Sequence, residues 1–273
     1  STLRLSAGSG YRIAQVFTED HAALTGAREV VFTENLNPEK SWNANLNYVQ
    51  KFFLKQGMII DVDLSFFKTH FSNKIIPNYS TDPNKIIYNN LNGKSISNGI
   101  SLNVNLLAQG GIRINLGGTY IDTYAEDNGV KTMPYLTERF QGVWKLEKKL
   151  SAIELTMDIS GNTVGPMRLP TLGELDPRHG YSDMFSILNI QLTKDWNNNF
   201  ETYGGIKNIL DFTPPANSIA RSFDPFDRRV IFDRSGNALP SANNPYALTF
   251  DPTYVYASNQ GIRFFFGLRW RFD

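Results

Sequence analysis

The sequence predicts an all-β chain that forms a transmembrane antiparallel up-and-down β-barrel. Three observations predict it. Apolar and polar residues alternate along about ten segments, as they do in strands with two different faces. Short and long connections alternate between these segments. No apolar run approaches the roughly 18 residues that a membrane-spanning helix needs, so strands are the elements that would cross.

Each predicted strand places apolar side chains on one face and polar ones on the other, because successive side chains point to opposite faces. The clearest lies at residues 41–53, where Trp42, Leu46 and Tyr48 alternate with asparagines. The last is the most regular, because the five alternate positions from residue 264 to residue 272 hold four aromatic residues and Leu268. The predicted strands cover residues 2–7, 41–53, 60–66, 100–106, 112–116, 139–147, 153–160, 188–193, 200–209 and 262–272.

The connections alternate in length along the chain. Short turns are predicted at residues 54–57, 109–111, 148–150 and 197–199, and long connections at residues 10–40, 71–99, 125–138, 161–184 and 212–260. Such a meander has one nearly bare end and one end covered by loops. Outer-membrane barrels have this asymmetry, with short periplasmic turns and long extracellular loops. The pattern therefore predicts the bacterial outer membrane, extracellular long loops and a periplasmic C-terminus.

A soluble β-sandwich is the rival fold, because its strands also alternate. Sandwich strands usually have about 5–6 residues, whereas membrane strands need about 9–11. Several predicted strands have the greater length, which favours the membrane barrel. A native protein that dissolves without detergent would favour the sandwich.

Composition and spacing exclude several functions. The 27 basic and 26 acidic residues are spread along the chain, which argues against nucleic acid as a partner. The chain has no cysteine, and its three histidines lack the spacing of a metal site, so no metal or cofactor is predicted. Asp224, Asp227 and Asp233 lie in one loop, but their spacing does not fit a calcium loop.

Two long connections carry arginines beside aromatic residues. Such pairs can bind an anionic, aromatic or sugar-like ligand through charge, stacking and cation–π contact. Packing between loops is the competing interpretation for each single residue. The candidate ligand-binding residues are Arg178, His179, Tyr181, Arg221, Phe223, Phe226, Arg228, Arg229, Tyr246 and Tyr254.

Four segments carry a family resemblance. Residues 6–12 end in a glycine–aromatic–arginine step, and residues 35–42 match the pattern N-L-x-P-E-x-S. Residues 205–211 match G-x-x-N-L-x-D with Ile209 in place of leucine, and residues 264–272 form an aromatic-ending strand that is followed by one further residue, Asp273. In this order, the segments resemble the C-terminal half of a TonB-dependent outer-membrane receptor, of the type found in Bacteroidetes.

The resemblance implies a barrel of roughly 22 strands closed by a separate N-terminal plug. Residues 1–273 would then be the C-terminal portion of the barrel, without the plug. The implied partners are the N-terminal plug and barrel portion of the same receptor, the TonB complex acting through that portion, outer-membrane lipid and a transported ligand. The implied function is active uptake of a bulky, scarce nutrient and not catalysis. An iron–siderophore or cobalamin-type ligand is favoured over a glycan or peptide.

One alternative belongs to another class of protein. A complete ten-stranded barrel would resemble an omptin-type outer-membrane protease, in which carboxylates and a histidine meet at the extracellular rim. His179 with Asp176 and Asp183 would be the candidates. An acid and a base must lie within hydrogen-bond reach of the reacting groups, which loop positions alone do not ensure.

Overall fold

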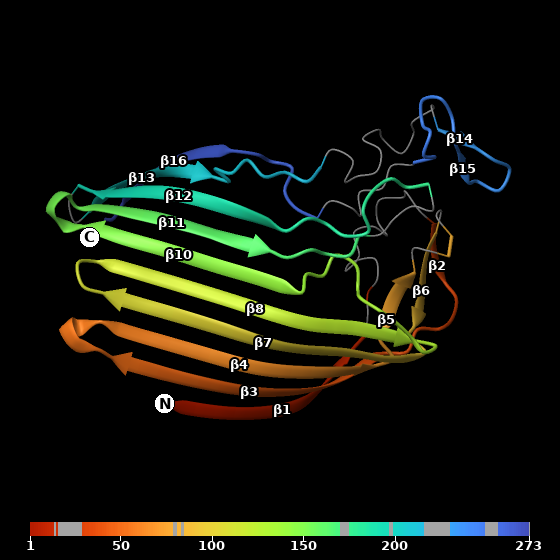
Figure 1. Cartoon of the computed structure of the whole chain (residues 1–273), viewed down its shortest axis with the longest axis horizontal. Coiled ribbons are helices and arrows are strands. Elements are labelled where there is room, and N and C mark those ends of the chain that lie inside the picture. The colour runs from red at the N-terminus through yellow and green to blue at the C-terminus, as the bar shows by residue number, and fades with distance from the viewer. Residues whose placement is uncertain are drawn as a thin grey trace.

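The computed structural model describes residues 1–13, 15, 29–78, 81–82, 85–169, 175–196, 199–215, 230–248 and 256–272. It confirms the all-β fold, and its main sheet has 11 strands (Figure 1). The sheet consists of β1 (Thr2–Arg12), β3 (Glu39–Phe53), β4 (Ile59–Ser72), β7 (Gly93–Ala108), β8 (Ile112–Asp127), β9 (Val130–Thr132), β10 (Phe140–Leu150), β11 (Leu155–Val164), β12 (Phe185–Asp195), β13 (Phe200–Lys207) and β16 (Arg263–Trp270).

Ten of these strands follow one another in chain order, each antiparallel to the next, and β9 pairs with β8. The order runs from β1 at one edge to β16 at the other, so the described strands form a partial barrel. Both chain termini lie at the end with the short turns (Figure 1). The ten strands are the ten that the sequence predicts.

The apolar face of the sheet is the exposed one. Trp42 is 67% exposed, whereas Asn45 and Asn47, on the opposite face of β3, are half-buried. The register aligns the apolar side chains into continuous rows across the sheet. One row consists of Phe52, Ile60, Leu106, Ile114, Leu146, Ile159, Ile190, Ile206 and Phe264.

The polar face is held together by side-chain hydrogen bonds across the strands. Asn47 donates to Asp63 at 2.6 Å and to Ser65 at 2.9 Å. Asn115 donates to Asn105 at 2.6 Å. An exposed apolar face opposite a bonded polar face is the arrangement of a barrel wall that meets lipid outside and water inside. In the residues that the structure describes, no helix is long and apolar enough to cross a membrane.

Further strands lie at the end with the long connections. A three-stranded sheet has the order β2 (Glu29–Phe32), β6 (Lys85–Asn90) and β5 (Ile75–Asn78), with β2 parallel to β6. A two-stranded ribbon joins β14 (Ile231–Phe232) and β15 (Ala238–Leu239) (Figure 1). These strands fall within the predicted long connections, which therefore hold regular structure. The small sheet has its own apolar core around Ile86 and Tyr88.

The structure confirms two of the four short turns that the sequence predicts. The 3-10 turn η1 (Lys55–Gly57) joins β3 to β4, and Gly110 and Gly111 join β7 to β8 with φ of 71° and 74°. The predicted turn at residues 148–150 is wrong. These residues pair with β11, and the chain reverses through η2 (Ser151–Ile153) instead. The last predicted turn falls mostly on residues 197–198, outside the described residues.

Candidate ligand-binding site

Charged side chains form a network on the polar face of the sheet. Lys145 on β10 lies 2.9 Å from Glu147 and 2.8 Å from Asp158, and Arg113 on β8 lies 3.0 Å from Glu147. The strand register places Arg113, Glu147 and Asp158 side by side on β8, β10 and β11. This part of the polar face thus carries paired charges, which are suited to a polar partner and not to lipid.

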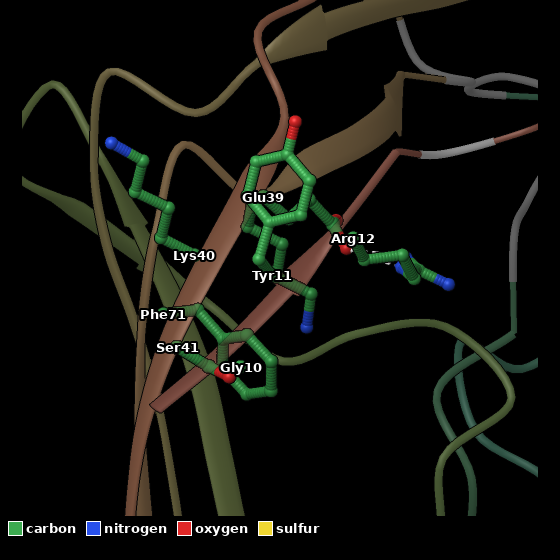
Figure 2. Close-up of a pocket in the computed structure, with 8 residues that line it drawn as sticks. Gly10, Tyr11, Arg12, Glu39, Lys40, Ser41 and Phe71 are labelled. Carbon is green, nitrogen blue, oxygen red and sulfur yellow. Dashed lines mark hydrogen bonds and ion pairs between the residues drawn. The ribbon is translucent and has the colours of Figure 1, made fainter. Parts of the chain in front are cut away.

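A pocket of about 470 Å³ opens where β1, β3 and β4 reach the end with the long connections (Figure 2). We call it the β1–β3–β4 pocket. Its lining combines aromatic, cationic and small residues with one carboxylate. The lining residues are Gly10, Tyr11, Arg12, Glu39, Lys40, Ser41, Phe71 and Lys74.

The carboxylate of Glu39 anchors one side of the β1–β3–β4 pocket. Glu39 is 5% exposed and accepts a hydrogen bond from Arg12 Nε at 2.7 Å. Its second oxygen accepts the backbone N–H of Ile75, the first residue of β5, at 2.8 Å. The contact joins the first two segments of the family resemblance, because Arg12 and Glu39 are opposite each other in the β1–β3 register. It also ties the small sheet to the main one.

Lys74 brings a partly buried ammonium group into the pocket. Its Nζ lies 5.0 Å from the centre of the Phe71 ring and donates to Ser95 Oγ at 3.5 Å. Burial lowers the pKa of Lys74 below its ordinary value. Glu39 opposes this shift of the pKa and Arg12 adds to it.

The third resembling segment has a structural role. Asn208 is 3% exposed and has a left-handed backbone with φ of 53°. Its amide donates to the carbonyl of Phe212 at 2.7 Å and its backbone N–H donates to Asn189 Oδ1 at 3.0 Å. Asp211 accepts the N–H of Ile262 at 3.0 Å. The segment fixes the chain where it leaves β13 and where it enters β16.

Four of the candidate loop residues lie in described segments. Arg178 is bonded to Asp176 by its backbone N–H and its guanidinium, and its side chain is only 6% exposed. His179 is exposed, and Tyr181 is exposed and forms a β-bridge with Arg168. Tyr246 is exposed in the turns after β15. Arg178 and Tyr181 thus contact residues near their own loop, Asp176 and Arg168, while Tyr246 lies in another loop.

The remaining candidates fall outside the described residues. They are Arg221, Phe223, Phe226, Arg228, Arg229 and Tyr254.

Asp224, Asp227 and Asp233, within residues 212–260, are potential calcium ligands by residue type. Asp224 and Asp227 lie outside the described residues, but Asp233 is described. Its carboxylate accepts the N–H groups of Asn237 and Ser235 at 2.9 and 2.8 Å, and these bonds, Asn237 foremost, lower its pKa. This is turn geometry. No cluster of three or more metal-ligating side chains occurs among the residues that the structure describes.

The sequence gives partial signs of the β1–β3–β4 pocket. Arg12 and Glu39 belong to recognisable segments, and their opposite charges at facing strand ends are a usable signal. Lys74 has no such signal, because it lies in a predicted long connection. Only the fold brings it beside Phe71 and Ser95.

The exposed apolar face, the polar opposite face and the loop-covered end define a transmembrane β-barrel. The chain belongs to the family described as TonB dependent receptor-like, beta-barrel, whose model matches residues 1–209. No curated protein matches the chain in sequence.

Solved structures agree with this fold. The pyoverdine outer membrane receptor FpvA from Pseudomonas aeruginosa PAO1 is 13% identical over 99% of this chain and 34% of its own, with a TM-score of 0.59. A variant of the ferric enterobactin receptor PfeA from Pseudomonas aeruginosa is 14% identical over 99% and 38%, with a TM-score of 0.60. The copper transporter OprC is 11% identical over 78% and 32%, with a TM-score of 0.59. The chain thus spans about a third of each structure's length.

The family and the matched structures are receptors and transporters, not enzymes, and they disfavour the protease alternative. The structure agrees at two points. Asp176, a candidate catalytic carboxylate, is bonded to Arg178 beside His179. In the described part of the chain, β1 and β16 lie at opposite edges, whereas a complete ten-stranded barrel requires them to pair. The sandwich alternative fails because the ten long strands form one sheet.

Proposed function

We propose that this chain is the C-terminal portion of the barrel of a TonB-dependent outer-membrane receptor that actively takes up a bulky, scarce nutrient. The observation that carries the proposal is the family match over residues 1–209, on a sheet whose apolar face is exposed. The order of the four resembling segments supports the C-terminal position and a Bacteroidetes-type receptor. The plug and the first barrel strands would be the partners of this chain, and the TonB complex would act through the plug.

The orientation follows from the two ends of the sheet. Short turns and both termini lie at one end, and the long connections with β2, β5, β6, β14 and β15 lie at the other (Figure 1). Outer-membrane barrels place short turns in the periplasm and long loops outside the cell. We assign the same orientation here, with a periplasmic C-terminus and extracellular loops.

The favoured cargo is an iron–siderophore or cobalamin-type ligand. The matched structures include receptors for pyoverdine and ferric enterobactin and a copper transporter. The similarity to these proteins favours a metal-bearing cargo over a glycan or peptide. The ten loop candidates would bind it from the extracellular side. Among them, Arg178 has its guanidinium bonded to Asp176 and is the weakest candidate.

Transport measurements in cells test the proposal. The full-length protein is produced in one strain with TonB and one without, and both receive labelled ferric siderophores, cobalamin and a malto-oligosaccharide. We expect saturable surface binding of an iron or cobalamin ligand in both strains, and uptake only with TonB. Uptake that persists without TonB would contradict an energised receptor. Uptake of the oligosaccharide alone would contradict the cargo but not the mechanism.

Replacing Arg228 and Arg229 together by alanine tests the large loop. If these side chains hold an anionic ligand, ligand affinity should fall at least about tenfold, as expected for the loss of charge-assisted hydrogen bonds. Arg234→Ala serves as the control, because Arg234 lies in the turn between β14 and β15 in the same connection. Unchanged affinity of the double variant would remove this loop from the site.

A further inference from the structure

We propose that the β1–β3–β4 pocket is a binding site for an aromatic carboxylate, in which Lys74 binds the carboxylate and Phe71 contacts the ring. The site rests on the proposed function in one respect: it would hold an aromatic carboxylate group of the nutrient that the receptor takes up. The binding chemistry itself depends on this chain alone. No candidate residue from the sequence lies in this pocket.

Among the described residues, two of the three cationic residues that line the pocket, Lys40 and Lys74, form no ion pair. Arg12 and Glu39 form an ion pair, which neutralises both. The side chain of Lys40 extends to the side opposite Arg12 (Figure 2). Lys74 forms no ion pair among the described residues, and its recorded contacts are Ser95 and the ring of Phe71. Lys74 is therefore the unpaired ammonium beside the Phe71 ring, and a single ammonium there suits a monoanion such as a carboxylate.

The surroundings of Lys74 favour a bound anion. An ammonium group has three N–H donors, and the one recorded hydrogen bond of Lys74, to Ser95 Oγ, is long at 3.5 Å. Ser95 is fully buried and donates its own proton to the carbonyl of Tyr124 at 3.1 Å. Ser95 is therefore fixed as an acceptor and contributes no charge. The two oxygens of nearby Glu39 are bonded to Arg12 and Ile75, so a carboxylate in the pocket would supply Lys74 with both acceptors and a direct charge partner.

The shape of the pocket fits a small aromatic group. Its volume of about 470 Å³ lies within the range of small-molecule sites, about 300–1,000 Å³. Phe71 and Tyr11 line it, and the Phe71 ring lies beside Lys74 Nζ. Gly10 leaves room for the Ser41 hydroxyl, because a Cβ at position 10 would come within 2.7 Å of Ser41 Oγ. An aromatic ring can pack on Phe71 while its carboxylate reaches Lys74.

Calorimetric titration of the detergent-folded full-length protein tests the site. The probe is benzoate, and benzamide has the same ring without the charge. We expect benzoate to bind at least about tenfold more tightly than benzamide, as a charge-assisted hydrogen bond predicts. Lys74→Met should remove this difference. Equal binding of benzoate and benzamide to the unsubstituted protein would overturn the proposal.

Lys131→Met is the matched control. Lys131 Nζ lies 4.9 Å from the centre of the Tyr124 ring, much as Lys74 lies over Phe71, but Lys131 is exposed and outside the pocket. Its loss should leave the preference for benzoate unchanged. Loss of the preference for benzoate in both variants would indicate nonspecific charge attraction and overturn the proposal. A preference for benzoate that survives Lys74→Met would overturn it as well. The titration needs neither TonB nor uptake, so its failure is distinguishable from failure of the transport function.

Discussion

At the scale of single residues, the contact between Arg12 and Glu39 links two separate parts of the structure. Glu39 bonds to Arg12 on β1 with one oxygen and to the backbone of Ile75 on β5 with the other. A carboxylate that accepts several hydrogen bonds can be buried at low cost, whereas an unpaired one cannot. Glu39 therefore attaches the small sheet of β2, β6 and β5 to the barrel wall.

Glu39→Gln should loosen this attachment. The substitution removes the charge that Arg12 contacts and weakens a bonded pair by about 1–3 kcal/mol. Because Arg12 is half exposed, it can turn to solvent, and we expect the lower end of this range. Amide hydrogen exchange of residues 75–78 should become faster. Glu29→Gln is the control, since exposed Glu29 contacts Lys85 only at 4.0 Å; equal exchange in both variants would contradict the role of Glu39.

Lys74 should give benzoate binding a characteristic pH dependence. Burial lowers the pKa of its ammonium group, so the positive charge that binds benzoate is lost as pH rises through the lowered pKa. The charge of Glu39 raises the pKa of Lys74, whereas the charge of Arg12 lowers it further. Benzoate affinity should thus fall at a lower pH than the ordinary lysine value of 10.5 would predict. A calorimetric series from neutral to alkaline pH measures it, and affinity that is constant to pH 10.5 would contradict it.

The candidate residues show what sequence reasoning could reach at this scale. Arginines beside aromatics identified Arg178, but the pattern could not tell that Asp176, two residues away, occupies its guanidinium. Lys74 carried no pattern at all, because its neighbours Phe71 and Ser95 come from different strands. Composition marks which residues can bind a ligand, but partners distant in sequence decide which are available.

At the scale of strands, the sequence predicts all ten consecutive strands of the main sheet, but several predicted strands are shorter than the observed ones. β7 begins at Gly93 and β8 continues to Asp127, beyond the predicted residues 100–106 and 112–116. In these extensions the alternation fades, since Lys94 opposite Glu126 and Asn98 opposite Asp122 occupy positions that continue the apolar face. Alternation therefore identifies the part of a strand whose apolar face is suited to lipid, and it ends where polar and charged residues replace the apolar ones.

The misplaced turn after β10 has a similar cause. The two lysines before Leu150 predict a polar turn, and Ile153 fits the apolar face of the strand predicted to follow. The chain instead reverses at η2, and Glu154 adopts a left-handed conformation with φ of 47°. Because many residues tolerate one such position at a moderate cost, the sequence marks it weakly.

Leu102 and Asn103 on β7 test the two faces of a strand. Leu102 is on the exposed apolar face and Asn103 lies opposite Asp63 on the polar face. Leu102→Arg should destabilise the folded barrel by up to about 2–4 kcal/mol if Leu102 lies near the bilayer midplane, because it places a charge in lipid. Asn103→Arg should cost far less. Urea unfolding in lipid vesicles measures both, and equal costs would contradict the assignment of faces.

At the scale of the whole molecule, the described sheet has two open edges. β1 and β16 each pair with one neighbour, β3 and β13. Unpaired strand edges promote association with other chains, and in the proposed receptor the remaining barrel strands would cover them. Residues 1–273 alone should therefore form oligomers in detergent, while the full-length protein should be monomeric. Light scattering after size-exclusion chromatography checks this, and a monodisperse monomer of residues 1–273 would contradict it.

The central claim is that the apolar face meets lipid and the polar face meets an aqueous lumen. Residues 1–273 contain no cysteine, so a single cysteine introduced along residues 100–106 of β7 is the only thiol in this part of the full-length protein. Labelling is compared with that of the protein without the introduced cysteine. In intact outer membranes, a water-soluble maleimide should label positions 101, 103 and 105, and a lipid-soluble one should label positions 100, 102, 104 and 106. Labelling without a period of two, or with the two reagents exchanged, would contradict the account.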